Sequence, residues 1–104
     1  MDYSLDRPRD SIALIEISIA PQVLDQRVAD ATVLLHLGSG CYYSLDGVGS
    51  RAWELLREHG RLEAVHRALL AEYEVSAERL WRDLQSLVDQ LADHRLLEVR
   101  HGGL

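Results

Sequence analysis

Two patterns of apolar residues divide the chain into an N-terminal half with strand signals and a C-terminal half with helix signals. In residues 11–19, Ile15, Ile17 and Ile19 alternate with polar residues. This two-residue period is typical of a strand with one buried face. Further strands are expected at residues 23–28, 32–37 and 41–45.

The strands at 32–37 and 41–45 are joined by a short loop that contains glycine, which is typical of a hairpin. The second of them is the last strand before the helical half. We therefore expect it at an edge of the sheet, where unpaired backbone groups can accept an added strand. Alternation along it places the side chains of residues 43 and 45 toward the core and those of 42 and 44 on the other face.

Beyond residue 46 the apolar residues recur at helical spacing. A first helix is expected to begin at the turn 46–49 and to end at Gly60, a natural C-terminal cap. A second helix is expected at 62–73. A third is expected at 76–93, with Ser76 as its N-cap.

This order of elements predicts an α+β domain with a winged helix-turn-helix arrangement, in which a small three-stranded antiparallel sheet is followed by three helices. A short closing strand is expected at 96–99. The domain is predicted to span residues 12–99, with a flexible tail at 1–11 and a second tail at 100–104.

Charge and cysteine content narrow the classes of function. The 104 residues carry a formal net charge of −6 without a basic stretch, so no nucleic acid partner is expected. Cys41 is the single cysteine and can form no disulfide within the chain. No apolar segment approaches the roughly 20 residues that cross a membrane. We therefore expect a cytoplasmic protein without a membrane partner.

The predicted architecture nevertheless raises DNA binding as an alternative, because winged folds commonly place their last helix in the major groove. In the helix predicted at 76–93, the acidic residues outnumber the basic ones and would repel phosphates. They are Glu78, Asp83, Asp89 and Asp93 against Arg79 and Arg82. DNA binding that strengthens as salt falls would identify such a regulator.

No arrangement of residues is typical of catalysis or of a metal site. The five histidines lack the i, i+4 spacing that places two ligands on one helical face. Cys41 lies inside a predicted strand, where a small apolar side chain is the ordinary occupant. A nucleophile motif and a phosphate-binding glycine loop are both missing from the sequence. We expect neither an enzyme nor a bound metal or cofactor.

Two segments of the sequence resemble the PqqD-like family. Residues 40–56, GCYYSLDGVGSRAWELL, are similar to the family's aromatic strand, its following turn and its Trp before paired leucines. Residues 83–97 are similar to the family's last helix and the two leucines after it. The resemblance covers about residues 23–99. Asp46 stands where the family usually has Asn, and Arg95 stands where a glycine would close the last helix.

The resemblance implies a non-catalytic domain that binds the leader segment of a ribosomally made precursor peptide. Members of the family add the leader to the third strand of the sheet, and leader side chains enter a groove beside the third helix. The same positions in this sequence belong to the strand at 41–45 and to one face of the last helix. They are Cys41, Tyr42, Tyr43, Ser44, Leu45, Arg79, Arg82, Asp83, Ser86, Leu87 and Gln90.

Within the family, the chain most resembles the stand-alone leader-binding proteins of lasso peptide biosynthesis, which act beside a leader peptidase and a cyclase. One alternative is a PqqD-type peptide chaperone that serves a radical enzyme in quinone cofactor synthesis. Another is a homodimer in which the strand at 12–19 covers the open sheet edge of its neighbour. Tyr42 also has a plain explanation as an aromatic residue that favours strands.

Overall fold

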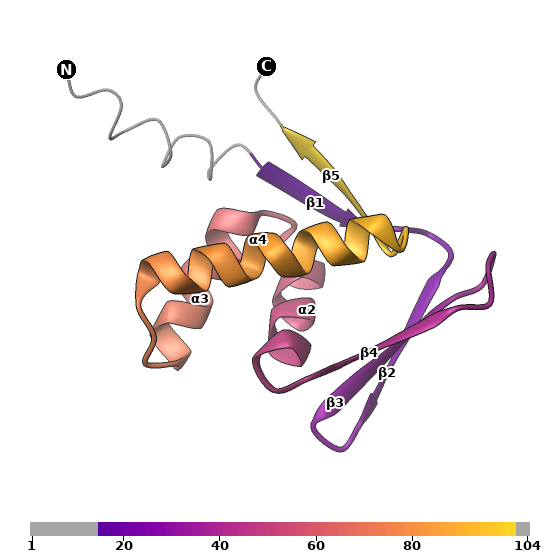
Figure 1. Ribbon diagram of the computed structural model, residues 1–104, viewed down its shortest axis with the longest axis horizontal. Coiled ribbons are helices and arrows are strands. Elements are labelled where there is room, and N and C mark those ends of the chain that lie inside the picture. The colour runs from indigo at the N-terminus through magenta and orange to yellow at the C-terminus, as the bar shows by residue number, and fades with distance from the viewer. Residues whose placement is uncertain (1–14, 102–104) are drawn as a thin grey trace.

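A computed structural model describes residues 15–101 (Figure 1). The elements follow the predicted order and are β1 (Ile15–Ile19), β2 (Val23–Val28), β3 (Ala31–His36), β4 (Tyr42–Asp46), α2 (Gly47–His59), α3 (Leu62–Glu72), α4 (Ala77–Asp93) and β5 (Leu97–His101). The expected α+β fold, a three-stranded antiparallel sheet followed by three helices, is confirmed. The predicted tail 1–11, residues 12–14 of the first predicted strand and residues 102–104 lie outside the described residues.

The strands form two small sheets rather than one. β2, β3 and β4 are antiparallel neighbours in that order, with Leu34 of β3 paired with Tyr43 of β4. β1 pairs with β5 in a second, two-stranded sheet, in which Ile17 lies opposite Val99. The strand patterns predicted β1 and the closing strand but not their pairing. β5 also runs two residues beyond the predicted end, through Arg100 and His101.

Helix α2 lies at the centre of the fold. It contacts β1 of one sheet, β3 and β4 of the other, and α3, while α4 packs on α3 and β5. Figure 1 shows α4 lying across the other two helices, with the three-stranded sheet extending to one side like a wing. The core is continuous through these elements, and Trp53 of α2 is its largest fully buried side chain. No helix within residues 15–101 combines the length and apolar composition needed to cross a bilayer.

The predicted helix ends are confirmed in detail. Gly60 ends α2 in the left-handed conformation, with φ of 70°, and its N–H donates to the carbonyl of Leu56. The carbonyl of Gly60 in turn accepts from the N–H of Ile17 at 2.8 Å, which ties β1 to the end of α2. Ser76 caps α4, because its hydroxyl accepts from the N–H of Arg79 at 3.1 Å.

The end of α4 has the backbone conformation of a glycine, although the residue there is Arg95. Arg95 has φ of 60°, in the region that favours glycine. Its N–H donates to the carbonyl of Ala92, and the N–H of Leu96 donates to the carbonyl of Leu91, both at 2.9 Å. These two bonds form a Schellman motif, so the chain keeps the glycine-type helix end at the cost of a strained arginine.

Arg95→Gly is therefore expected to stabilise the protein by about 0.5–1 kcal/mol, because glycine adopts this conformation without the Cβ penalty and loses only part of the gain to its entropy. Asp89→Gly, at an exposed position inside α4, is the matched control and is expected to destabilise by about 1 kcal/mol. Urea denaturation followed by circular dichroism measures both. Equal destabilisation by the two variants would contradict the proposed strain.

Candidate functional site

Strand β4 lies at an edge of the three-stranded sheet. Among the described residues its only strand partner is β3, so the backbone groups on its other side are not paired in a ladder. The expected edge position is confirmed. Such an edge can accept an added strand.

The register identifies which β4 residues present backbone groups at this edge. Residues of an antiparallel pair alternate between those that bond to the partner and those that bond away from it. The N–H of His36 donates to the carbonyl of Cys41 at 2.9 Å, so this pair points inward to the sheet. By alternation Tyr43 and Leu45 also bond to β3. The N–H and C=O groups of Tyr42 and Ser44 point outward and form the free edge.

The side chains of β4 alternate as expected from the sequence. Leu45 is buried and Tyr43 is half-buried against the core, whereas Tyr42 and Ser44 are exposed on the opposite face. Tyr42 is 75% exposed, more than any other large apolar residue among those described. Cys41 is exposed immediately before the strand.

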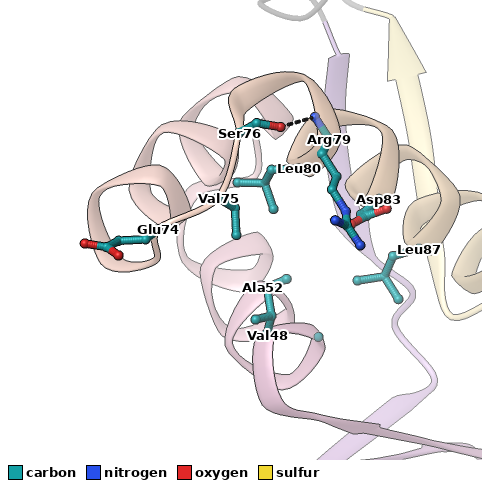
Figure 2. A pocket seen from close by; sticks show the side chains of 10 residues that line it. Val48, Ala52, Glu74, Val75, Ser76, Arg79, Leu80, Asp83 and Leu87 are labelled. Carbon is teal, nitrogen blue, oxygen red and sulfur yellow. Dashed lines mark hydrogen bonds between the residues drawn. The ribbon is translucent and has the colours of Figure 1, made fainter.

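A hollow of about 710 Å³ lies between the start of α2, the α3–α4 connection and one face of α4 (Figure 2). Its apolar lining comes from all three elements: Val48, Ala52, Val75, Leu80 and Leu87. Polar atoms are added along one wall by Ser76, Arg79 and Asp83. Its wall on α2 begins at Val48, two residues after β4 ends at Asp46. The hollow can hold apolar side chains of a guest whose backbone follows the β4 edge.

The six predicted helix positions do not all lie in the hollow. Arg79, Asp83 and Leu87 line the hollow. Arg82 and Ser86 are exposed on α4 but are outside the lining. Val48 and Val75 also line the hollow, where both are partly exposed, and neither was among the predicted site residues. Val48 lies in the first turn of α2, where helical spacing cannot distinguish a groove wall from a core contact. Val75 lies in the α3–α4 connection, outside any helical pattern.

Gln90, the remaining predicted helix position, contacts β4 directly. The Tyr43 hydroxyl donates to Oε1 of Gln90 at 2.6 Å. The Tyr43 ring also meets the His94 ring edge to face, with 5.0 Å between ring centroids. Nδ1 of His94 lies 2.8 Å from the carbonyl of Gln90. These contacts join the edge strand to the last turn of α4.

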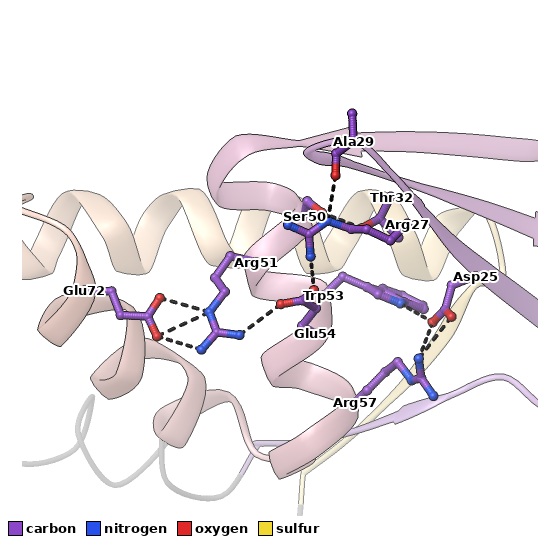
Figure 3. Close-up of polar contacts among 10 residues, drawn as sticks. All are labelled: Asp25, Arg27, Ala29, Thr32, Ser50, Arg51, Trp53, Glu54, Arg57 and Glu72. Atoms are coloured by element: carbon purple, nitrogen blue, oxygen red, sulfur yellow. Dashed lines mark hydrogen bonds and ion pairs between the residues drawn. The ribbon is translucent and has the colours of Figure 1, made fainter.

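Polar contacts hold α2, one wall of the hollow, against the sheet (Figure 3). Nε1 of the buried Trp53 donates to Asp25 of β2 at 2.7 Å, and Arg57 also donates to that carboxylate. Thr32 of β3 and Ser50 of α2 are both buried and share a hydrogen bond. Because a buried polar group is costly without its partner, these bonds fix the position of α2.

A second set of ion pairs links α2 to α3 on the surface. Arg51 donates to Glu72 at 2.8 Å and to Glu54 at 2.9 Å. The hydrogen bonds from Arg51 lower the pKa of the Glu72 carboxyl, and those same bonds raise the pKa of the guanidinium. All three side chains are partly exposed, so solvent screening keeps the contribution to stability small.

The outer face of the three-stranded sheet carries an apolar patch, although it points away from the core. A shallow hollow of about 550 Å³ is lined there by Leu24, Val28, Val33, Leu35 and Tyr42, together with Asp25 and Gln26. Leu24 and Val28 are 55% and 53% exposed, while Gln26 and Ser44 add polar groups to the same face. Because the solvent face of an antiparallel sheet is ordinarily polar, this apolar patch indicates an interaction surface.

The part of the chain that the structure describes contains no group of three or more His, Cys, Asp or Glu side chains placed to hold a metal ion. The arrangement near β4 therefore rests on a backbone edge, an apolar hollow and a few charged side chains. This combination suits an extended peptide.

Comparisons with known proteins agree with this geometry. The sequence profile of the family described as coenzyme PQQ synthesis protein D (PqqD) matches residues 31–97. No curated protein matches the sequence significantly.

Two solved structures have a similar fold. One, described as TbiB1 in complex with the TbiA(beta) leader peptide, is 43% identical, with a TM-score of 0.75, and the match covers 78% of this chain and 94% of that one. The other, described as lasso peptide synthetase B1 complexed with the leader peptide, is 25% identical, with a TM-score of 0.73, and the match covers 80% of this chain and 98% of that one.

The alternation along β4 is directly measurable by amide hydrogen exchange. The amides of Tyr43 and Leu45 are expected to exchange at least about tenfold more slowly than those of Tyr42 and Ser44, because only the first pair donates within the ladder. Exchange followed by two-dimensional NMR gives each rate. Equal protection of the four amides would show that the outward groups of β4 are already bonded.

Proposed function

Because the chain belongs to the PqqD family, we propose that it binds the leader segment of a ribosomally synthesised precursor peptide and presents it to the processing enzymes of lasso peptide biosynthesis. The observation that carries this proposal is the free backbone edge of β4 beside the hollow along α4. The two similar structures support it, since both are leader-peptide complexes and one of them is a lasso peptide synthetase subunit.

The leader binds as an added strand on β4. The outward N–H and C=O groups of Tyr42 and Ser44 exchange hydrogen bonds with water for hydrogen bonds with the leader backbone. Such bonds are available to any extended peptide, so they provide affinity with little dependence on sequence. Since β4 ends at Asp46, only a short stretch of leader is held in this way.

Side chains of the leader that point inward give the sequence preference. They enter the hollow between the start of α2 and α4, where Val48 and Leu87 provide apolar contact and Arg79 and Asp83 provide charge. Exposed ion pairs at such a rim contribute only about 0–1 kcal/mol each, so apolar contacts dominate the discrimination. Of the predicted peptide-binding residues, Arg82 and Ser86 lie outside the hollow and make peripheral contacts.

The protein acts by binding and not by catalysis, in the cytoplasm where the precursor is made. The PqqD-type chaperone for a radical enzyme shares this binding step and differs in the enzyme served. The lasso assignment is preferred because a lasso peptide synthetase subunit is among the similar structures.

Ser44→Pro is expected to weaken leader binding at least about tenfold, because proline removes an outward N–H that the leader needs. The variant is expected to fold, since this N–H takes no part in the β3–β4 ladder. Fluorescence anisotropy of the fluorescein-labelled leader of the precursor encoded beside the gene measures the affinity, and far-ultraviolet circular dichroism checks the fold.

Ser44→Ala is the matched control, because it removes the same side chain and keeps the N–H. Its affinity is expected to stay within about twofold of the wild type. If folded Ser44→Pro binds the leader as tightly as Ser44→Ala, the leader does not bind through this edge. Saturable binding by neither variant nor wild type would refute the proposed function itself.

The leader peptidase docks on the apolar outer face of the sheet. This face is continuous with the leader site, because Tyr42 belongs to β4 and also lines the outer hollow. An added strand extends the sheet, so its outward side chains lie next to Tyr42 and enlarge the same face. The peptidase thus contacts the loaded protein over a larger surface than the empty one.

Leu24→Glu tests this surface. The substitution places a charge on β2, two strands away from the leader edge, so leader affinity is expected to remain within about twofold. Cleavage of the precursor by the leader peptidase is expected to slow at least about tenfold. Mass spectrometry of the precursor measures cleavage. Ser18→Glu, which adds the same charge on an exposed residue of β1, is expected to leave cleavage unchanged.

Unchanged cleavage by the Leu24→Glu protein would exclude the outer face as the peptidase site. Light scattering on the wild type provides a second check. A dimer that becomes a monomer on Leu24→Glu substitution would assign this face to a second copy of the chain and would equally contradict the peptidase proposal.

A further inference from the structure

The contact between Tyr43 and Gln90 joins β4 to α4 outside the lining of the hollow. Tyr43 points to the inner face of the sheet and is half-buried, and its hydroxyl reaches α4 to donate to Gln90 at 2.6 Å. His94 supports the Tyr43 ring from the side, and its own ring is held near the Gln90 carbonyl. Residues of β4 and of the end of α4 thus hold the contact in place.

The hollow stops short of this contact. Its lining on α4 runs from Ser76 to Leu87 and includes neither Gln90 nor His94. Gln90 lies one helical turn beyond Leu87, on the side toward the end of α4. Along α4, the hollow therefore lies toward the start of the helix and the Tyr43–Gln90 contact toward its end.

The geometry of the added strand determines which leader residue lies next to the Tyr43–Gln90 contact (the bridge). Since Tyr42 and Ser44 bond outward, a leader that runs antiparallel to β4 places one residue opposite Tyr43 in a non-hydrogen-bonded pair. In such a pair the Cα atoms are about 4.5 Å apart and both side chains point to the same face. This leader side chain therefore meets the Tyr43 ring and the Gln90 amide. The leader residue opposite Leu45, two positions away, faces the open hollow instead.

We propose that Tyr43 and Gln90 are specificity-determining residues that restrict the leader to a small side chain opposite Tyr43 and so set the register in which it binds. The inference rests on the proposed leader binding. A leader shifted along β4 by two residues would bring a large apolar side chain against the bridge and leave the hollow unfilled. The bridge thus selects one register among those that the backbone edge alone would accept.

A tryptophan scan of the leader tests the proposal. The probes are fluorescein-labelled copies of the leader encoded beside the gene, each with one residue replaced by tryptophan, and anisotropy gives the affinity of each. Gln90→Ala removes the α4 half of the bridge at an exposed helical position, so its fold is expected to be intact. Tyr43→Phe removes only the hydroxyl. Asp89→Ala, the exposed neighbour of Gln90, is the matched control.

In the wild type, tryptophan is expected to weaken binding strongly at the leader position opposite Tyr43. Gln90→Ala is expected to recover at least about threefold in affinity at that position and at no other, and Tyr43→Phe to act in the same direction. The double variant Gln90→Ala, Tyr43→Phe should recover about as much as the larger single effect and less than the product of the two, because both substitutions remove the same contact. Asp89→Ala should leave the whole scan unchanged.

Two results would overturn the inference. One is a scan that Gln90→Ala leaves unchanged, and the other is a recovery spread evenly over all leader positions, which a general loosening of the groove would produce. Both leave the proposed function standing, because the wild type still binds the unsubstituted leader. Failure of the wild type to bind that leader would instead refute the proposed function, on which this inference depends.

Discussion

A backbone N–H or C=O at the edge of a sheet must find a partner, and in the unbound protein that partner is water. In β4 this requirement falls on alternate residues, because Tyr43 and Leu45 complete the ladder with β3 while Tyr42 and Ser44 point outward. The rest of the site depends on this alternation. It determines where a guest strand can bond, and it also determines which guest side chains face inward.

The position of α2 limits the length of the β4 edge to which a guest strand can bond. β4 runs directly into α2, so the edge cannot extend past Asp46, and the first turn of the helix forms a wall of the hollow. That wall is fixed by buried contacts, of which the Trp53 to Asp25 bond and the Thr32 to Ser50 bond are the clearest. A groove held in place by the core loses little entropy when a peptide enters it.

The short strand β4 therefore contributes to three surfaces. Its outward backbone groups face the guest, Tyr43 on its inner side faces α4, and Tyr42 on its outer side belongs to the apolar face of the sheet. In the proposed function, β4 therefore holds a peptide and also borders the docking face of an enzyme. In the proposed function, the peptide itself connects the two surfaces.

Local patterns were sufficient to predict the elements and their order, because the strand period of two, the helical stripes and the residues at helix ends each depend on a few neighbours along the chain. Gly60 and Ser76 show this clearly, since each was predicted to end or begin a helix and does so. The order of the strands predicted that the last of them lies at an edge, and the resemblance to the PqqD-like family added the helix beside it. Arg95 adopts the backbone conformation of the glycine that the family has there.

Which side chains meet across elements depends on the folded chain. Val48 follows the same helical pattern as the core residues of α2, yet it is partly exposed in the hollow, because the pattern shows that a side chain is apolar and not what covers it. Val75 lines the same hollow from the α3–α4 connection, where no helical pattern applies. The bond between Tyr43 and Gln90 joins residues far apart in the chain. The pairing of β1 with β5 is decided in the same way, since the distance between two elements depends on how the whole core packs.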